Sequence, residues 1–137
     1  MAPVLAIDYG GKRTGIAVTD PLQLIASGLT TVPTAELFAF VQDYVNEEEV
    51  ELILVGEPKQ RDGSASEIEE KIAKFVRRLQ QELPQVPVER ADERFTSKMA
   101  FQAMIDGGLS KKKRADKGLV DKLSATIILQ DYLERKR

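Results

Sequence analysis

The stretch LAIDYGGKRTGIAVTD, residues 5–20, decides the fold class of this chain. The apolar residues 4–7 end in a carboxylate, Asp8, and a second apolar run at 16–18 follows a Gly-Gly turn. Two apolar, β-branched runs around such a turn predict two antiparallel strands joined by a short connection. The acid that ends the first strand, Asp8, is therefore the first residue whose role needs an explanation.

The rest of the chain alternates between strand and helix patterns. Apolar runs bounded by Gly and Pro predict strands, and apolar residues at three- and four-residue spacing predict helices. The expected strands are residues 4–9, 14–20, 24–32, 51–56 and 86–92, and the expected helices are 34–46, 64–83, 96–105 and 119–133. Short connections join the first three strands, and helical crossovers join the later ones. The sequence thus predicts an α/β fold with a five-stranded mixed sheet, a three-strand antiparallel meander plus two parallel strands, flanked by helices.

Several helix starts carry capping signals. Thr34 is placed to cap the first helix, and Ser64 with Glu67 offers a capping box for the second. Thr96 is placed to cap the third helix. Residues 109–118 are basic and without periodicity, so we expect a loop before the last helix.

Composition restricts the possible chemistry. The 137 residues fit one domain, residues 1–137. Cysteine and histidine are both absent, which excludes disulfides, thiolate nucleophiles, Cys-ligated zinc and histidine bases. An enzyme built from this chain must use carboxylates, hydroxyls, lysine, tyrosine or metal-bound water.

No apolar stretch approaches the roughly 20 residues of a membrane span, and the N-terminus lacks a signal-peptide layout. We therefore expect a cytoplasmic protein without membrane contact.

Acidic residues fall where a parallel sheet places its sites, beyond the carboxyl ends of the strands. Asp8 ends the first predicted strand, Glu57 follows the fourth and Glu93 follows the fifth. Asp121 lies in the last helix, where Ala125 follows on the same, largely apolar face. We expect these acids to converge on one edge of the sheet.

Crowded carboxylates repel one another, and their burial without a counter-charge raises their pKa values or destabilises the site. A divalent cation removes this conflict. Mg²⁺ or Mn²⁺ takes oxygen ligands and needs neither histidine nor cysteine. Two such ions roughly 3.5–4 Å apart could activate a water and stabilise the leaving oxygen of a phosphodiester. The acids therefore predict a site for Mg²⁺ or Mn²⁺.

Basic residues flank the acids, although the net charge is −2. A run of cations beside carboxylates suits the phosphates of a long anionic polymer, either structured RNA or branched DNA. The candidate nucleic-acid-binding residues are Lys12, Arg13, Lys59, Arg61, Arg94, Lys111, Lys112, Lys113, Arg114 and Lys117. Arg13 and Arg94 fit equally well as counter-ions to the acids, and the run KKKRADK at 111–117 also fits a solvated loop.

Each acid also has a simpler interpretation. Asp8 could end a strand as turn acids do, and Glu93 could pair with Arg94. Asp121 could be a favourable acid in the first turn of a helix.

Four ordered motifs distinguish these interpretations. The chain resembles the YqgF/RuvX family of ribonuclease H-like proteins through AIDYGGKRTGIAVTD, VGEPKQRDGS, ADERFTS and DKGLVDKLSATIILQDYL. The resemblance implies a ribonuclease H-like fold and a nuclease that hydrolyses phosphodiesters at the 5′ end of the 16S rRNA precursor during ribosome biogenesis. Holliday junction resolution in DNA recombination and repair is the older suggestion for such proteins.

The resemblance also assigns site residues. Carried over motif by motif, the family's catalytic and metal-binding acids fall on Asp8, Glu93 and Asp121. The family usually has Gly-Leu-Pro where this chain has Gly-Glu-Pro, so Glu57 is a departure and a candidate extra ligand. Residues 59–64 are implied to form a loop that faces the substrate.

Other functions remain open at this point. A two-domain ATPase of the sugar-kinase, actin or chaperone type has a similar first phosphate loop, but the chain is long enough for only one such domain. A non-catalytic RNA-binding assembly factor would keep the fold without the chemistry, and the retained acids count against it. We expect a monomer or a weak homodimer.

Overall fold

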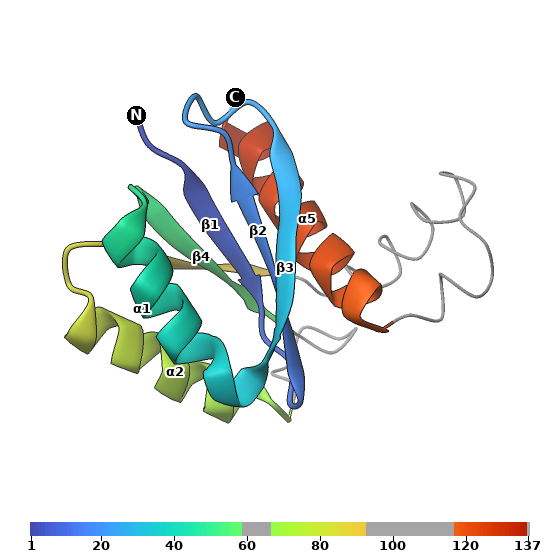
Figure 1. Ribbon diagram of the computed structural model, residues 1–137. Coiled ribbons are helices and arrows are strands. Elements are labelled where there is room, and N and C mark those ends of the chain that lie inside the picture. The colour runs from blue at the N-terminus through green and yellow to red at the C-terminus, as the bar shows by residue number, and fades with distance from the viewer. Residues whose placement is uncertain (59–66, 93–116, 137) are drawn as a thin grey trace.

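The structure, a computed structural model, describes residues 1–58, 67–92 and 117–136, with the side chains of 117 and 118 excluded (Figure 1). The helix expected at 96–105, the Thr96 cap and most of the basic segment at 109–118 lie outside these residues.

The sheet has the predicted topology. Its strands are β1 (Val4–Asp8), β2 (Arg13–Thr19), β3 (Ala26–Pro33), β4 (Leu52–Glu57) and β5 (Val88–Asp92). They lie in the order β3-β2-β1-β4-β5. The first three strands pair antiparallel, while β4 pairs parallel with both β1 and β5. The mixed five-stranded sheet is therefore confirmed.

Helices cover both faces of this sheet. The helices α1 (Leu37–Glu47) and α2 (Glu69–Glu82) pack on one face, and α5 (Lys117–Lys136) packs on the other (Figure 1). Leu5 and Ile7 of β1 belong to the core under α1 and α2, whereas Val4 and Ala6 belong to the core under α5. Alternate side chains of β1 therefore pack into two separate cores, one on each face of the sheet. Among the described residues, no helix is long and apolar enough to cross a membrane.

The predicted helix cap at Thr34 is wrong, and α2 begins after the predicted capping box of Ser64 with Glu67. Thr34 begins a short 3₁₀ turn, Thr34–Glu36, and its side chain does not cap a helix. The helix α2 begins at Glu69, because Ile68 accepts the first helical backbone hydrogen bonds. Glu67 lies in the preceding turn, and Ser64 lies outside the described residues.

The strand β3 begins at Ala26 rather than at residue 24 as predicted, because the residues before Ala26 belong to the hairpin loop between β2 and β3. The carboxylate of Asp20 accepts backbone N–H groups from Leu22 at 3.2 Å, Leu24 at 2.8 Å and Ile25 at 2.8 Å. These backbone donors, that of Ile25 most strongly, hold the pKa of Asp20 below its usual value. A turn acid, rather than strand pairing, therefore orders these residues.

Candidate active site

The carboxyl ends of the three mutually parallel strands meet at one edge of the sheet. Asp8 is the last residue of β1, and Glu57 is the last residue of β4. Glu57 is in register with Asp92, which ends β5. Asp8, Glu57 and Asp92 therefore end their strands at the same edge of the sheet, and Glu93, the next residue in the sequence, lies outside the described residues.

Strand alternation separates the acids between the two faces of the sheet. Asp8 follows Val4 and Ala6 at two-residue spacing, and both belong to the core under α5. Alternation therefore puts Asp8 on the α5 face. Glu57 follows Val55, which belongs to the core under α1 and α2. By the same argument Glu57 lies on the opposite face from Asp8.

The backbone of Asp121 packs against a glycine that is paired with Asp8 in the sheet. Gly15 of β2 is in register with Asp8 of β1. A Cβ built on Gly15 would lie 1.9 Å from the backbone carbonyl oxygen of Asp121. The first turns of α5 therefore rest directly on β2, because position 15 has no side chain. The fold thus places the backbone of Asp121 against the residue that pairs with Asp8, although the two acids are far apart in the sequence.

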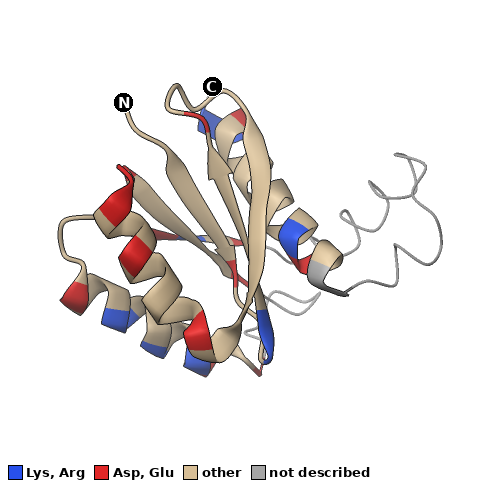
Figure 2. Ribbon diagram, in the orientation of Figure 1, with Lys and Arg blue, Asp and Glu red and all other residues tan. Residues whose placement is uncertain are grey.

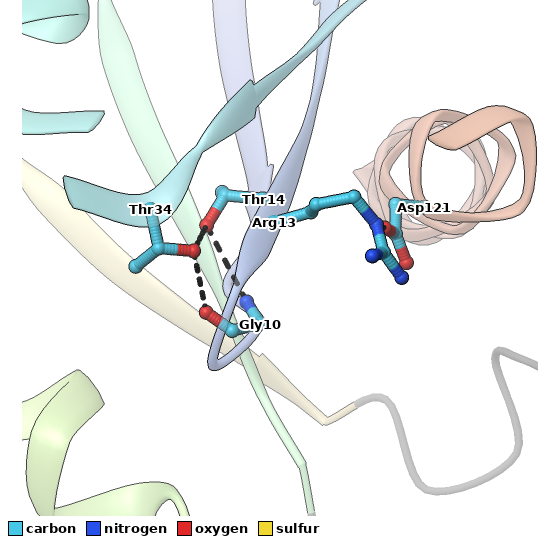
Figure 3. Close-up of polar contacts among 5 residues, drawn as sticks. All are labelled: Gly10, Arg13, Thr14, Thr34 and Asp121. Carbon is cyan, nitrogen blue, oxygen red and sulfur yellow. Dashed lines mark hydrogen bonds and ion pairs between the residues drawn. The ribbon is translucent and has the colours of Figure 1, made fainter. Parts of the chain in front are cut away.

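Arg13 is bound to Asp121. Its Nε donates to Oδ2 of Asp121 at 3.2 Å, with 42% and 26% of the two side chains exposed (Figure 3). Figure 2 shows the positive charge at the start of β2 at the same end of the molecule as the acid near the start of α5. Arg13 therefore acts as a counter-ion in this structure, and the neighbouring Lys12 is exposed.

Two threonines that sequence reasoning missed as site residues fix the turn after Asp8. The backbone N–H of Gly10 donates to Oγ1 of Thr14 at 3.4 Å, and the hydroxyls of Thr14 and Thr34 lie 2.9 Å apart. The hydroxyl of Thr34 donates to the carbonyl oxygen of Gly10 at 2.6 Å (Figure 3).

This arrangement closes a ring of three hydrogen bonds on Gly10. Because the hydroxyl of Thr34 gives its proton to Gly10, it must accept the proton of Thr14. The backbone N–H of Thr34 also donates to the carbonyl of Lys12 at 2.9 Å. The turn between Asp8 and Arg13 is therefore held at Gly10 and at Lys12 by Thr34, the residue that follows β3. The only sequence signal was a polar residue, Thr14, at the start of an apolar strand.

Arg90 holds the end of β4. Its Nε donates to the carbonyl of Val55 at 3.3 Å, and its Nη2 donates to the carbonyl of Gly56 at 3.1 Å. Its Nη1 and Nη2 also pair with both oxygens of Glu69 in α2, at 2.9 and 2.5 Å. One guanidinium therefore ties β5, β4 and α2 together at the edge that carries the acids.

Several candidate residues belong to segments that the structure does not describe. Glu93, Arg94, Lys59, Arg61 and residues 111–114 lie outside the described residues, as does the side chain of Lys117. Within residues 1–58, 67–92 and 117–136, no three acidic side chains lie close enough to hold a metal ion. Of the predicted ligands in the described part of the chain, Asp8 is in register with Gly15, and the backbone of Asp121 lies against Gly15.

The chain matches one known protein family over nearly its whole length. A family model described as "RuvX: Holliday junction resolvase" matches residues 2–135. The chain belongs to the RuvX family. The chain is 61% identical over 133 residues to a protein of Christiangramia forsetii, with 97% of this chain and 98% of that protein covered. It is 58% identical over 136 residues to a protein of Flavobacterium psychrophilum, with 99% of each covered. Both relatives are named "Putative pre-16S rRNA nuclease".

Solved structures confirm the ribonuclease H-like fold that the RuvX resemblance implied. The structure entitled "T. thermophilus RuvC in complex with Holliday junction substrate" matches with a TM-score of 0.58 at 21% identity. The match covers 99% of this chain and 96% of that chain. A second Thermus thermophilus RuvC structure matches with a TM-score of 0.57 at 19% identity, covering 98% of this chain and 96% of that chain. Because the sequence identities to these two structures are low, the likeness supports the fold of this chain and no further property.

Proposed function

We propose that this chain is a divalent-metal-dependent nuclease that matures the 5′ end of 16S rRNA. The observation that carries the proposal is the close approach of the Asp121 backbone to Gly15, the residue in register with Asp8, in a chain of the RuvX family. The names of its relatives support the substrate.

The donor set fits Mg²⁺ or Mn²⁺. The acids at this place offer only carboxylate oxygens, and the whole chain lacks the histidine and cysteine that softer metals prefer. Asp8 and Asp121 would hold the ion, and Glu93 would complete the set. Glu57 is left out of the proposed set because alternation puts it on the other face.

The chain's own residues perform the remaining tasks. A bound divalent ion supplies positive charge to the scissile phosphate and lowers the pKa of a water. Asp8 and Asp121 fix the place of this charge, and the threonine ring on Gly10 keeps Asp8 and Arg13 at a constant separation. Water is the proposed nucleophile, because the hydroxyls of this chain have no histidine to activate them.

Basic residues would bind the RNA backbone. Lys12 and Arg13 stand at the turn beside the acids. The proposed set also includes cations whose side chains the structure does not describe: Lys59, Arg61, Arg94, Lys111, Lys112, Lys113, Arg114 and Lys117. Contacts with phosphates position a nucleic acid without reading its sequence. We therefore propose that the structure of the precursor, rather than a base motif, selects the cleavage position.

Holliday junction resolution is the second candidate, because the family description names it. Both substrates would use the same acids. The two functions differ in symmetry, since a resolvase must cut two strands of a four-way junction as a pair. We propose that the protein is a monomer or a weak homodimer, which favours the rRNA precursor over a junction that needs a symmetric pair. We also propose that it acts in the cytoplasm, as one domain over residues 1–137.

Parallel cleavage assays test the proposal. The purified chain is incubated with a 5′-extended 16S precursor and with a four-way DNA junction, with Mg²⁺, with Mn²⁺ or with a chelator. We expect metal-dependent cleavage of the precursor, no paired cuts in the junction, and no cleavage by Asp8→Asn. An Asp8→Asn protein that still binds RNA separates an enzyme from an assembly factor. Wild-type protein that binds the precursor and never cuts it, with either metal, would contradict the proposal.

A further inference from the structure

Arg13 combines a fixed backbone with a side chain that has room to move. It is the first residue of β2 and is in register with Pro33 of β3. The backbone N–H of Thr34 donates to the carbonyl of Lys12, directly before Arg13. The side chain of Arg13 is 42% exposed, and its Nε reaches Oδ2 of Asp121 across 3.2 Å (Figure 3). The guanidinium can therefore leave Asp121 without a change in the fold.

We propose that Arg13 is the counter-cation of Asp121 in the metal-free protein. A divalent ion that binds Asp121 displaces the guanidinium of Arg13, and this guanidinium then binds a phosphate of the nucleic acid. The inference rests on the proposed function, because it assumes that Asp121 is a metal ligand. It adds an order of events: the uptake of metal frees the residue that binds the substrate.

Electrostatics supports the exchange. A guanidinium and a divalent ion are both attracted to the carboxylate of Asp121 and repel each other at short distance. The ion carries twice the charge, and an ion pair as exposed as Arg13–Asp121 contributes little. A released guanidinium has a fork of N–H donors that matches two phosphate oxygens. Arg13 therefore has a better partner once Asp121 holds a metal.

The exchange couples the two binding events. In the metal-free protein, Arg13 keeps Asp121 from standing uncompensated near Asp8. A metal ion makes Arg13 available to phosphate, and a phosphate on Arg13 makes Asp121 available to metal. Such coupling is reciprocal by linkage. We expect the protein to bind each partner more tightly in the presence of the other.

The test is the affinity for Mn²⁺ without any nucleic acid, measured from the electron paramagnetic resonance signal of free Mn²⁺. Arg13→Gln removes the competing cation and is expected to bind Mn²⁺ about fivefold more tightly than wild type, the upper range for an exposed pair. Lys12→Gln is the matched control, because it removes the same charge from the adjacent exposed position. It is expected to change the affinity less than about twofold. Arg13→Lys keeps the charge and should stay near wild type.

Each other outcome contradicts a specific step. Equal tightening in Arg13→Gln and Lys12→Gln would mean a general charge effect and would overturn the exchange. Weaker Mn²⁺ binding by Arg13→Gln would mean that Arg13 orients Asp121 for the metal, which also overturns it. A wild-type protein that binds no Mn²⁺ would overturn the metal site of the proposed function and the exchange with it.

Discussion

Gly15 touches Asp121: a Cβ at position 15 would lie 1.9 Å from the backbone carbonyl oxygen of Asp121, and 2.8 Å from the backbone nitrogen of Lys122. Two elements that are far apart in the sequence, β2 and α5, therefore approach each other backbone to backbone. This contact sets the separation between Asp121 and Asp8, which is in register with Gly15.

Gly15→Ala is expected to push the start of α5 away from β2, because the added methyl meets backbone atoms that cannot rotate aside. We expect a loss of about 2 kcal/mol in the free energy of unfolding, together with a loss of cleavage. Gly11→Ala is the control, since a Cβ at Gly11 meets nothing within 4 Å. Urea unfolding of both variants measures the difference. Equal stability of the two variants would contradict the close approach.

Thr34→Val is expected to break the ring of hydrogen bonds on Gly10. It leaves the carbonyl of Gly10 and the hydroxyl of Thr14 without their partner in the ring, at a cost of about 1–3 kcal/mol. Thr34→Ser keeps the hydroxyl and should retain most of the stability and the wild-type affinity for Mn²⁺. Denaturant unfolding and Mn²⁺ titration of both variants check this. A serine variant as impaired as the valine variant would show that the methyl group, not the hydroxyl, matters.

Arg90→Met keeps the aliphatic stem of the side chain and removes its charge and donors. The side chains of Arg90 and Glu69 are only 23% and 21% exposed. We therefore expect a loss of about 2 kcal/mol in the free energy of unfolding. Arg135→Met is the control, because Arg135 and Asp131 are 59% and 51% exposed and their pair should contribute less than about 0.5 kcal/mol. Similar losses in both variants would refute the role assigned to Arg90.

Asp20→Ala is expected to lower stability in a pH-dependent way. Backbone donors lower the pKa of Asp20 in the folded protein, that of Ile25 most strongly. A carboxyl group whose pKa is lower in the folded state stabilises the protein above its unfolded pKa, about 4, and loses this effect as the pH falls through the folded pKa.

The stability gap between wild type and Asp20→Ala should therefore stay constant from neutral pH to about pH 5 and close at lower pH. Asp20→Asn keeps one acceptor oxygen and no charge, so its gap to Asp20→Ala should not change with pH. Thermal unfolding at a series of pH values measures both gaps. A wild-type gap that is constant down to pH 2 would contradict the assignment.

The sheet could be predicted from the sequence because its signals are local. Strand alternation, the Gly-Gly turn and the lengths of the connections determine which strands pair and in which direction. The position of Asp121 could also be inferred, since Ala125 and Ile128 mark the buried face of α5. These two patterns together predict that Asp121 and Asp8 face the same side of the sheet.

The polar contacts of the site could not be predicted, because their partners are distant in the sequence. Thr34 matches the local pattern of a helix cap, yet its hydroxyl donates to the carbonyl of Gly10, in the turn between β1 and β2. Arg13 and Asp121 become partners only when α5 packs on β2. The face of Glu57 depends on the register of β4, and a shift of one residue would reverse it.

The claim on which this account depends is that Asp8 and Asp121 bind one divalent ion together. The most direct measurement is anomalous diffraction from a crystal soaked in Mn²⁺, collected at the manganese edge. We expect an anomalous peak within coordination distance of both carboxylates, with the guanidinium of Arg13 moved away from Asp121. Ordered carboxylates of Asp8 and Asp121 without an anomalous peak between them would contradict the claim.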